Sequence, residues 1–194
     1  LETRHGSALA IKTAMERVVS TPLVMICQHD NFFVNKAPLR EVVFALREER
    51  GLGIGATCIH LLSTATLGYR DKIQRRYNLD LGEPISVKYL KYPLVPLIFW
   101  YGRSHVTYSD YVRSYCLNRP IRKGTHLEEL LGESQLNDIR SRGLVAHKEY
   151  GTYVLDQGVE VLYHVSGRRA ISMNSSYDRK QIGEGKRGLH NSFQ

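Results

Sequence analysis

Short apolar runs that alternate with longer amphipathic segments constrain this chain most. The run LVMIC at residues 23–27 is continuously apolar and stops at polar residues 28–31. A continuous rather than alternating run is typical of a strand buried on both faces of a parallel sheet. Similar runs lie at residues 53–60 and 97–101. Strands of this kind between helices predict an α/β fold with a mainly parallel sheet flanked by helices.

The segments between these runs have apolar residues at helical spacing. Ser7 is a candidate N-cap for the first of them, and Pro38 and Gly51 bracket the second, as expected for a helix start and stop. We expect helices over residues 7–21, 38–51, 69–78, 108–117 and 126–143. Two alternating segments, at residues 151–156 and 160–165, predict a C-terminal β-hairpin across the turn DQG.

The length of 194 residues fits one domain, which we place at residues 1–171. Residues 172–194 are polar and Gly-rich, and we expect them to form a mobile tail. No run approaches the ~20 apolar residues that cross a bilayer, and no secretory signal is present. These observations predict a cytoplasmic protein without a membrane span, although the chain begins at Leu1 rather than at a methionine.

The formal charge of +8 indicates an anionic partner: a nucleic acid, a membrane surface or a phosphorylated ligand. No nucleic-acid motif is present and the basic residues are not interleaved with aromatic platforms, which argues against nucleic acid. Cys27, Cys58 and Cys116 are widely spaced and form no C-x-x-C pair. This spacing argues against zinc and iron–sulfur clusters and predicts reduced, mostly buried thiols.

Asp30 follows the apolar run by a few residues, so we expect it at the carboxyl end of a central strand, facing an open cleft. Ligands of open α/β sheets bind beyond that edge. A single carboxylate there suits Mg²⁺ or Mn²⁺, which takes one or two protein carboxylates and completes its shell with phosphates and water. The alternative is that Asp30 only caps the next turn together with Asn31.

Five segments in a fixed order resemble small GT-A nucleotide-sugar glycosyltransferases of algae and their large DNA viruses. They cover roughly residues 5–168 and read TPLVMICQHDNFFV, FWYGRSH, GTHLEELLGESQLNDIRSRG, AHKEYGTYVLDQG and YHVSGR. The first resembles the metal-binding strand of that group, which ends in Gln-His-Asp. The resemblance implies a GT-A, Rossmann-like fold whose first β-α unit has no counterpart before Leu1. Gly102 stands where the group has an aspartate.

The resemblance implies a metal-dependent inverting transfer of a sugar from a UDP- or GDP-type nucleotide sugar to a glycan or other hydroxyl acceptor, as in hexosyltransferases. It assigns Asp30 and His164 as metal ligands, for Mn²⁺ or Mg²⁺, and Glu129 as the catalytic base, with Glu128 beside it. Side-chain chemistry adds further candidates. Gln28 and His29 of the Gln-His-Asp motif and the guanidinium of Arg168 are candidate nucleotide-sugar contacts, and Trp100, Tyr101 and His105 are candidate acceptor or sugar contacts.

Each assignment has an alternative that the residues leave open. Adjacent acidic residues such as Glu128 and Glu129 are also favoured at helix starts, where they interact with the helix dipole. His164 fits an exposed strand position, and Trp100 fits the core. The whole chain could instead be a basic α/β module that binds nucleotides or nucleic acid without catalysis. The transferase hypothesis predicts that Asp30, Glu129 and His164 line one cleft.

Overall fold

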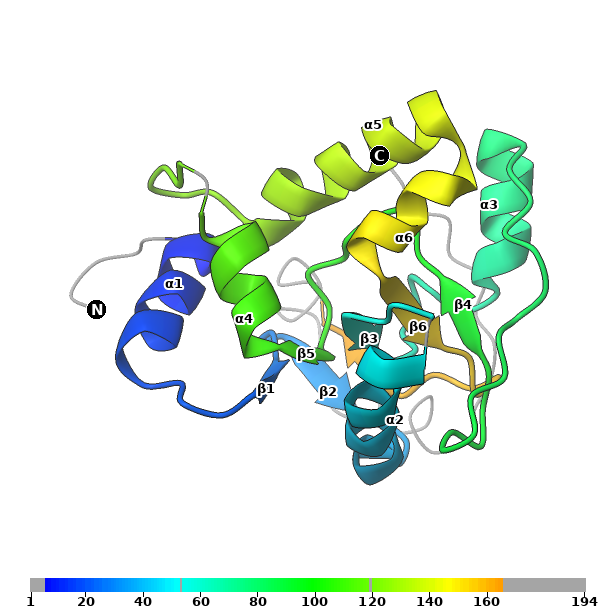
Figure 1. Ribbon diagram of the computed structural model, residues 1–194, viewed down its shortest axis with the longest axis horizontal. Helices are drawn as coiled ribbons and strands as arrows, with labels where there is room; N and C mark the ends of the chain where they lie inside the picture. Colours follow the sequence, from blue (N-terminus) through cyan, green and yellow to red (C-terminus); the bar gives the residue numbers. More distant parts are fainter. Residues whose placement is uncertain (1–5, 53, 119, 166–194) are drawn as a thin grey trace, which may run out of the picture.

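The computed structural model describes residues 6–52, 54–118 and 120–165 (Figure 1). The helices are α1 (Ser7–Arg17), α2 (Leu39–Leu52), α3 (Tyr69–Tyr77), α4 (Ser109–Tyr111), α5 (Glu133–Arg142) and α6 (His147–Tyr150), with π-helical turns η1 (Val112–Cys116) and η2 (Glu128–Gly132) and the 3-10 turn η3 (Leu144–Ala146). The strands are β1 (Leu23–Ile26), β2 (Asn31–Phe33), β3 (Cys58–His60), β4 (Leu94–Pro96), β5 (His105–Tyr108), β6 (Thr152–Leu155) and β7 (Leu162–His164). The predicted tail at residues 172–194 lies outside the described residues.

The fold is α/β, as predicted, but the prediction of a mainly parallel sheet is wrong. The main sheet has five strands in the order β1-β5-β3-β6-β4. Its parallel pair is β3 with β6; β1 with β5, β3 with β5 and β4 with β6 are antiparallel. β2 and β7 form a separate antiparallel pair. The structure is therefore a mixed sheet flanked by helices.

The apolar run at residues 23–27 gives an edge strand, not the predicted central one. β1 pairs with β5 and its four residues are partly buried. Leu23 and Met25 pack with the cluster around α2, whereas Val24 and Ile26 pack with the cluster around α1. Both faces of β1 are thus covered, which explains why the run is continuously apolar. Its outer hydrogen-bonding edge lies beside no other strand of the sheet, so two-sided burial does not require a parallel partner.

The helix predictions are confirmed within a few residues, but several strand predictions are not. The run at residues 97–101 is not a strand, since β4 ends at Pro96. The expected C-terminal hairpin is also wrong: β6 pairs with β3 and β4, whereas β7 pairs with β2. The alternating patterns identified two strands correctly, but β3 and β4 pair with both edges of β6 and leave no edge for β7. β2 and β5 were not predicted from the sequence.

Helices cover the two faces of the main sheet. α2 places Val42 and Leu46 against Ile59 of β3 on one face. α1 places Ala8 and Met15 in the cluster that contains Cys58 on the other face. Figure 1 shows α1 beside α4 at one side of the molecule and α3 next to β4 at the opposite side. Among the described helices, none is both long and apolar enough to span a membrane.

Gly151 connects α6 to β6 at a point where only glycine fits. It adopts φ +59° at the C-terminal end of α6. Its carbonyl accepts hydrogen bonds from the backbone N–H groups of Thr57 at 2.8 Å and Cys58 at 3.2 Å, immediately before and at the start of β3. A Cβ atom at Gly151 would lie 2.0 Å from the carbonyl oxygen of Gly55. This close approach lies directly before the parallel pairing of Cys58 with Thr152.

We expect Gly151→Ala to destabilise the protein far more than Gly82→Ala. Both glycines have positive φ, but Gly82, with φ +72°, has no atom within 4 Å of an added Cβ. The control should lose about 1–2 kcal/mol from the left-handed backbone conformation alone. Gly151→Ala should lose about 1–3 kcal/mol more, because the backbone must move. Urea unfolding measures the free energy of unfolding of both variants. Equal losses would show that the backbone near Gly55 moves away from the new side chain without a cost in stability.

His147 is a buried histidine of α6, and folding lowers the pKa of its side chain. Its Nε2–H donates to the carbonyl oxygen of Thr152 at 2.6 Å, and its ring lies 4.9 Å from that of Tyr153. Burial lowers the pKa of His147 below its ordinary value of 6.5, and the hydrogen bond to Thr152 offsets part of this effect. The native state therefore binds this proton less readily than the unfolded chain does.

We expect this difference to make stability depend on pH. Because the native pKa of His147 is lower than the unfolded one, stability is full above pH ~6.5 and falls as pH is lowered toward the native pKa. His147→Gln keeps an N–H donor without a titrating group. Its free energy of unfolding, measured in urea between pH 7 and 5, should fall less steeply than that of the unmodified chain. Parallel curves would contradict the assignment.

Candidate functional site

Asp30 and His164 meet at the carboxyl end of β1. After β1 the chain turns and enters β2, whose first residue pairs with His164 of β7. The backbone N–H of Val165 donates to the carbonyl oxygen of Asp30 at 3.0 Å. This pairing brings two side chains 134 positions apart into contact, with Nε2 of His164 2.9 Å from Oδ2 of Asp30. Each side chain is about one-third exposed, at 31% for Asp30 and 32% for His164.

The second carboxylate oxygen of Asp30 has no partner among the described residues. Oδ1 is buried and accepts no hydrogen bond there. A carboxylate oxygen removed from water without a donor is costly unless a cation or another donor compensates it. A carboxylate and an imidazole in contact, with one oxygen uncompensated, form a donor set that suits a divalent cation. The residues therefore fit the metal that the sequence resemblance implies.

Polar side chains next to Asp30 form a connected group. Asn31 donates from Nδ2 to Oε1 of Gln28 at 3.2 Å. The Arg103 guanidinium donates to Oδ1 of Asn31 at 3.4 Å. An added Cβ on Gly102 would lie 2.6 Å from Nε2 of Gln28 and 3.0 Å from Oε2 of Glu128, so both side chains lie against this glycine. The segment before β5 thus adds the Arg103 cation to the surroundings of Gln28, and η2 adds the carboxylate of Glu128.

The two adjacent glutamates have different surroundings. Glu128 is partly buried, and its Oε2 accepts a hydrogen bond from the backbone N–H of Gly102 at 3.2 Å. Glu129 is exposed, and its Oε2 accepts one from the backbone N–H of His126 at 3.3 Å, three residues earlier. Residues three apart at a helix start make this kind of capping bond. The carboxylate of Glu128 thus lies at Gly102, close to Gln28, whereas that of Glu129 is hydrogen-bonded to the backbone at the start of its own helix.

The remaining candidates that the structure describes are divided between the core and the surface. Trp100 and His105 are each 1% exposed, so the structure places them in the core and not on a surface that a sugar reaches. Tyr101 is partly buried; burial raises the pKa of its phenol, and its ring lies 5.2 Å from that of Phe99. His29 is exposed. Arg168 lies outside the described residues.

Sequence reasoning missed Asn31 as a connector and Arg103 as a cation of this site. Asn31 was considered only as a capping partner of Asp30. Arg103 lies inside the FWYGRSH segment, one of the five that carry the motif resemblance, but the resemblance gives it no role. A basic residue directly before a buried strand was the available signal, because such a residue lies at a sheet edge. The predicted thiols are also divided: Cys27 is exposed and Cys58 is buried.

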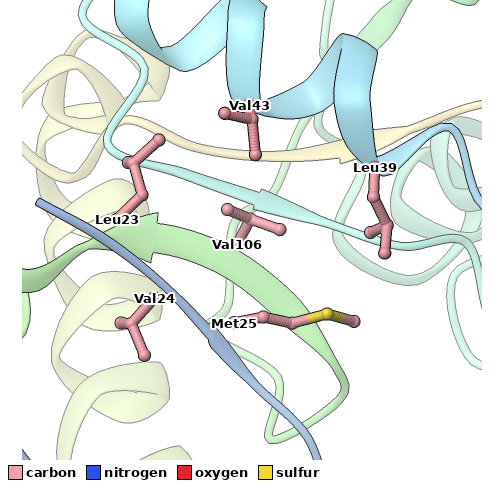
Figure 2. Close-up of a pocket in the computed structure, with 6 residues that line it drawn as sticks. All are labelled: Leu23, Val24, Met25, Leu39, Val43 and Val106. Atoms are coloured by element: carbon pink, nitrogen blue, oxygen red, sulfur yellow. The ribbon is translucent and has the colours of Figure 1, made fainter. Parts of the chain in front are cut away.

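Two hollows lie elsewhere on the molecule. The first, of about 130 Å³, lies between β1, β5 and α2 and is apolar throughout (Figure 2). The second, of about 200 Å³, has Ile98 and Ile139 in its wall. Neither has Asp30, Gln28 or Glu128 in its lining. The first hollow lacks the hydrogen-bonding groups that orient a polar ligand, and the wall of the second combines Tyr77 and Arg140 with apolar residues. More polar side chains gather around Asp30 than in either hollow, so the group around Asp30 is the better functional candidate.

Comparisons with known proteins identify no family for this chain. No protein-family model, no curated protein and no solved structure matches it.

Proposed function

We propose that the protein is a metal-dependent glycosyltransferase that moves a sugar, with inversion, from a nucleoside-diphosphate sugar to a hydroxyl acceptor. The contact between Asp30 and His164 carries this proposal. A carboxylate and an imidazole 134 positions apart meet at 2.9 Å, and the second oxygen of the carboxylate is buried without a partner. The motif resemblance assigned a metal to these same two residues.

Asp30 and His164 would hold the metal. The mixed oxygen and nitrogen donor set favours Mn²⁺ over Mg²⁺, because Mg²⁺ binds through oxygen ligands and waters. When bound, such an ion supplies positive charge that stabilises the leaving diphosphate. Arg103, hydrogen-bonded to Asn31, adds a guanidinium that can pair with phosphate oxygens.

Glu128 is the better candidate for the base that takes the proton from the acceptor hydroxyl. Its carboxylate accepts a hydrogen bond from Gly102, which the Gln28 side chain also approaches, whereas that of Glu129 bonds its own helix start. A positioned general base contributes about 10²–10⁴-fold to the rate. Gly102 permits this close approach of the two side chains, since an added Cβ would lie 3.0 Å from Oε2 of Glu128 and 2.6 Å from Nε2 of Gln28.

The first test of the proposal is Asp30→Asn. It keeps the size of the side chain and removes the charge that would hold a divalent cation. Loss of even an outer-shell partner of a metal costs about 10–100-fold in affinity, so loss of this ligand should weaken Mn²⁺-dependent binding of UDP or GDP at least as much. Calorimetry of the full chain with and without Mn²⁺ measures this. Stability should change by only about 0–1 kcal/mol, because the pair is partly exposed.

Asp71→Asn is the matched control, since Asp71 is exposed on α3 and lies outside the group around Asp30. It should leave nucleotide binding unchanged. If Asp30→Asn retains the full Mn²⁺-dependent affinity, the metal is not held by Asp30 and the proposal fails. Salt-steep binding of oligonucleotides, together with no Mn²⁺-dependent nucleotide binding, would support the basic non-catalytic module instead.

The second test compares Glu128→Gln with Glu129→Gln. Each substitution is isosteric and removes one carboxylate from adjacent positions. Sugar release from a panel of UDP- and GDP-sugars should fall about 10²-fold or more in Glu128→Gln, as expected for loss of a general base. Glu129→Gln should retain activity within a few-fold and lose only part of a capping bond. A larger loss of activity in Glu129→Gln than in Glu128→Gln would identify Glu129 as the base.

A further inference from the structure

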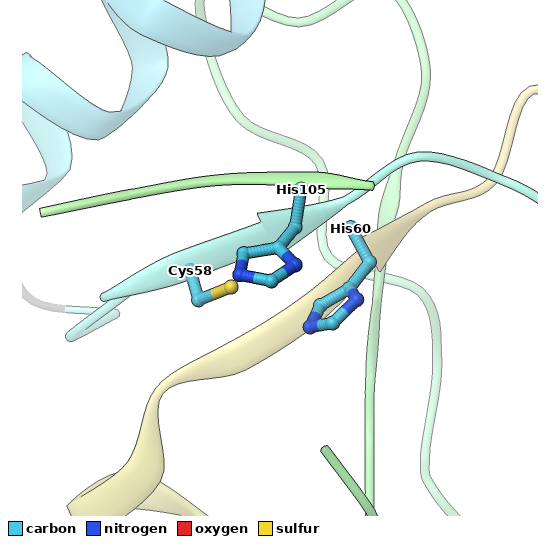
Figure 3. Close-up of side chains that lie close together, drawn as sticks. All are labelled: Cys58, His60 and His105. Carbon is cyan, nitrogen blue, oxygen red and sulfur yellow. The ribbon is translucent and has the colours of Figure 1, made fainter. Parts of the chain in front are cut away.

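A second group of metal-ligating side chains lies in the core, apart from Asp30 and His164. Cys58 and His60 are two residues apart on β3, so they share one face of the sheet (Figure 3). His105 of β5 pairs directly with His60 across the antiparallel ladder. The backbone N–H of Leu61 donates to the carbonyl oxygen of Ser104 at 3.1 Å, so His60 and His105 form a non-hydrogen-bonded pair, whose side chains lie closest.

The three ligand atoms already lie near one another. One donor atom from each of Cys58, His60 and His105 falls within 4.8 Å of the other two. Bond lengths of about 2.3 Å to sulfur and 2.0 Å to nitrogen require ligand atoms about 3.3–3.7 Å apart around one ion. The distances between the donor atoms therefore need to shorten by up to about 1.5 Å. The ring of His60 can rotate to do so without breaking any of its own hydrogen bonds, since neither nitrogen has a partner among the described residues.

The imidazole nitrogens in this group are buried and uncompensated. His60 and His105 are each 1% exposed. Both ring nitrogens of His60 and Nε2 of His105 lack a hydrogen-bond partner among the described residues. Each such group costs about 1–3 kcal/mol when nothing replaces the water it has lost. An apolar side chain of similar size at residue 60 would avoid this cost, so the histidine indicates a ligand rather than packing alone.

His105 has the outer-shell arrangement of a metal-binding histidine. Its Nδ1 lies 2.6 Å from the carbonyl oxygen of Arg103, and a carbonyl only accepts, so Nδ1 carries the proton. The lone pair is therefore on Nε2, the unpartnered nitrogen. Metal-ligating histidines usually donate their other N–H to a carbonyl or carboxylate in this way.

We propose that Cys58, His60 and His105 form a buried structural site for one thiophilic d¹⁰ cation, Cu⁺ or Zn²⁺, that links β3 to β5. A thiolate with two imidazoles is a soft donor set that both ions accept. Binding displaces the thiol proton of Cys58 to solvent, and no electron is transferred. The site is independent of the proposed transferase activity, whose carboxylate-containing site selects a harder ion.

Charge and ligand number favour Cu⁺ over Zn²⁺. One thiolate and two neutral imidazoles give a neutral complex with a monovalent ion but a net charge of +1 with Zn²⁺, and an uncompensated charge in the core is expensive. Structural zinc takes four ligands. Across the described ranges, no fourth histidine, cysteine, aspartate or glutamate belongs to this group. Three donors are enough for Cu⁺.

Trp100 covers the site and reports on it. Its ring lies 5.6 Å from that of His60 and 4.9 Å from that of His105, edge-on to both. It is 1% exposed and is the single tryptophan of the chain. The indole thus excludes water from the ligands. Any ion bound by Cys58 and the two imidazoles lies close enough to change the fluorescence of Trp100.

The test loads the reduced full chain with Cu⁺ or Zn²⁺ under anaerobic conditions, including during refolding, and follows Trp100 fluorescence. We expect saturation at one equivalent per chain, with retention of the ion after removal of excess. We also expect an increase in melting temperature, since an ion that binds only the native state stabilises it. Competition between the two ions decides which is bound more tightly, and either preference supports the site.

His60→Leu and Cys58→Ala should each abolish the fluorescence change at one equivalent. Cys27→Ala, which removes an exposed thiol, should leave it unchanged. Without metal, His60→Leu should be at least as stable as the unmodified chain, because it removes two unpaired polar atoms; this measurement separates loss of the site from loss of the fold. Saturable binding that survives His60→Leu, or the absence of any Cu⁺- or Zn²⁺-dependent change in the unmodified chain, would overturn the proposal. Neither outcome bears on Mn²⁺ and nucleotide binding.

Discussion

The backbone pairing of β3 is the constraint on which the rest of the structure depends. This strand is three residues long and fully buried, so its amides and carbonyls must find partners on both edges. β5 supplies one edge and β6 the other, in opposite directions. The turn at Gly151 reinforces the start of the strand, because its carbonyl accepts hydrogen bonds from two successive amides there. A side chain at Gly151 would separate β6 from β3.

The direction of β5 determines where the polar groups lie. Because β5 runs antiparallel to β1, the segment before it, with Gly102 and Arg103, emerges at the end of the sheet where β1 ends. The loop after β1 enters β2, which pairs with β7 and thereby delivers His164 to Asp30. The loop after β1, the segment before β5 and the end of β7 thus bring their charged residues together in one partly exposed group.

The same pairing places a second group inside the sheet. Side chains on β3 alternate, so Ile59 packs toward α2 while Cys58 and His60 face the cluster with Trp100. The spacing of the cysteines suggested no metal site, because two ligands lie on one strand and the third is 45 positions later on another. Cysteine and histidine two residues apart in a strand was the local signal. The two groups differ in hardness, exposure and charge, and therefore in the ions they would select.

The sequence by itself determined the elements whose signals are local. Helix periodicity and end signals located α1, α2, α3 and α5, and the apolar run of β1 correctly indicated that both faces are covered. Asp30 was also identified at the end of a strand. Only the tertiary structure decided strand order and direction, because side chains alternate with the same period in parallel and antiparallel pairs. The resemblance had assigned His164 and Asp30 to one metal, but only the tertiary structure showed that Glu128 rather than Glu129 bonds Gly102 and that His105 is buried. Each of these contacts depends on which distant segment of the chain lies next to the residue, and the spacing of residues along the chain does not indicate this.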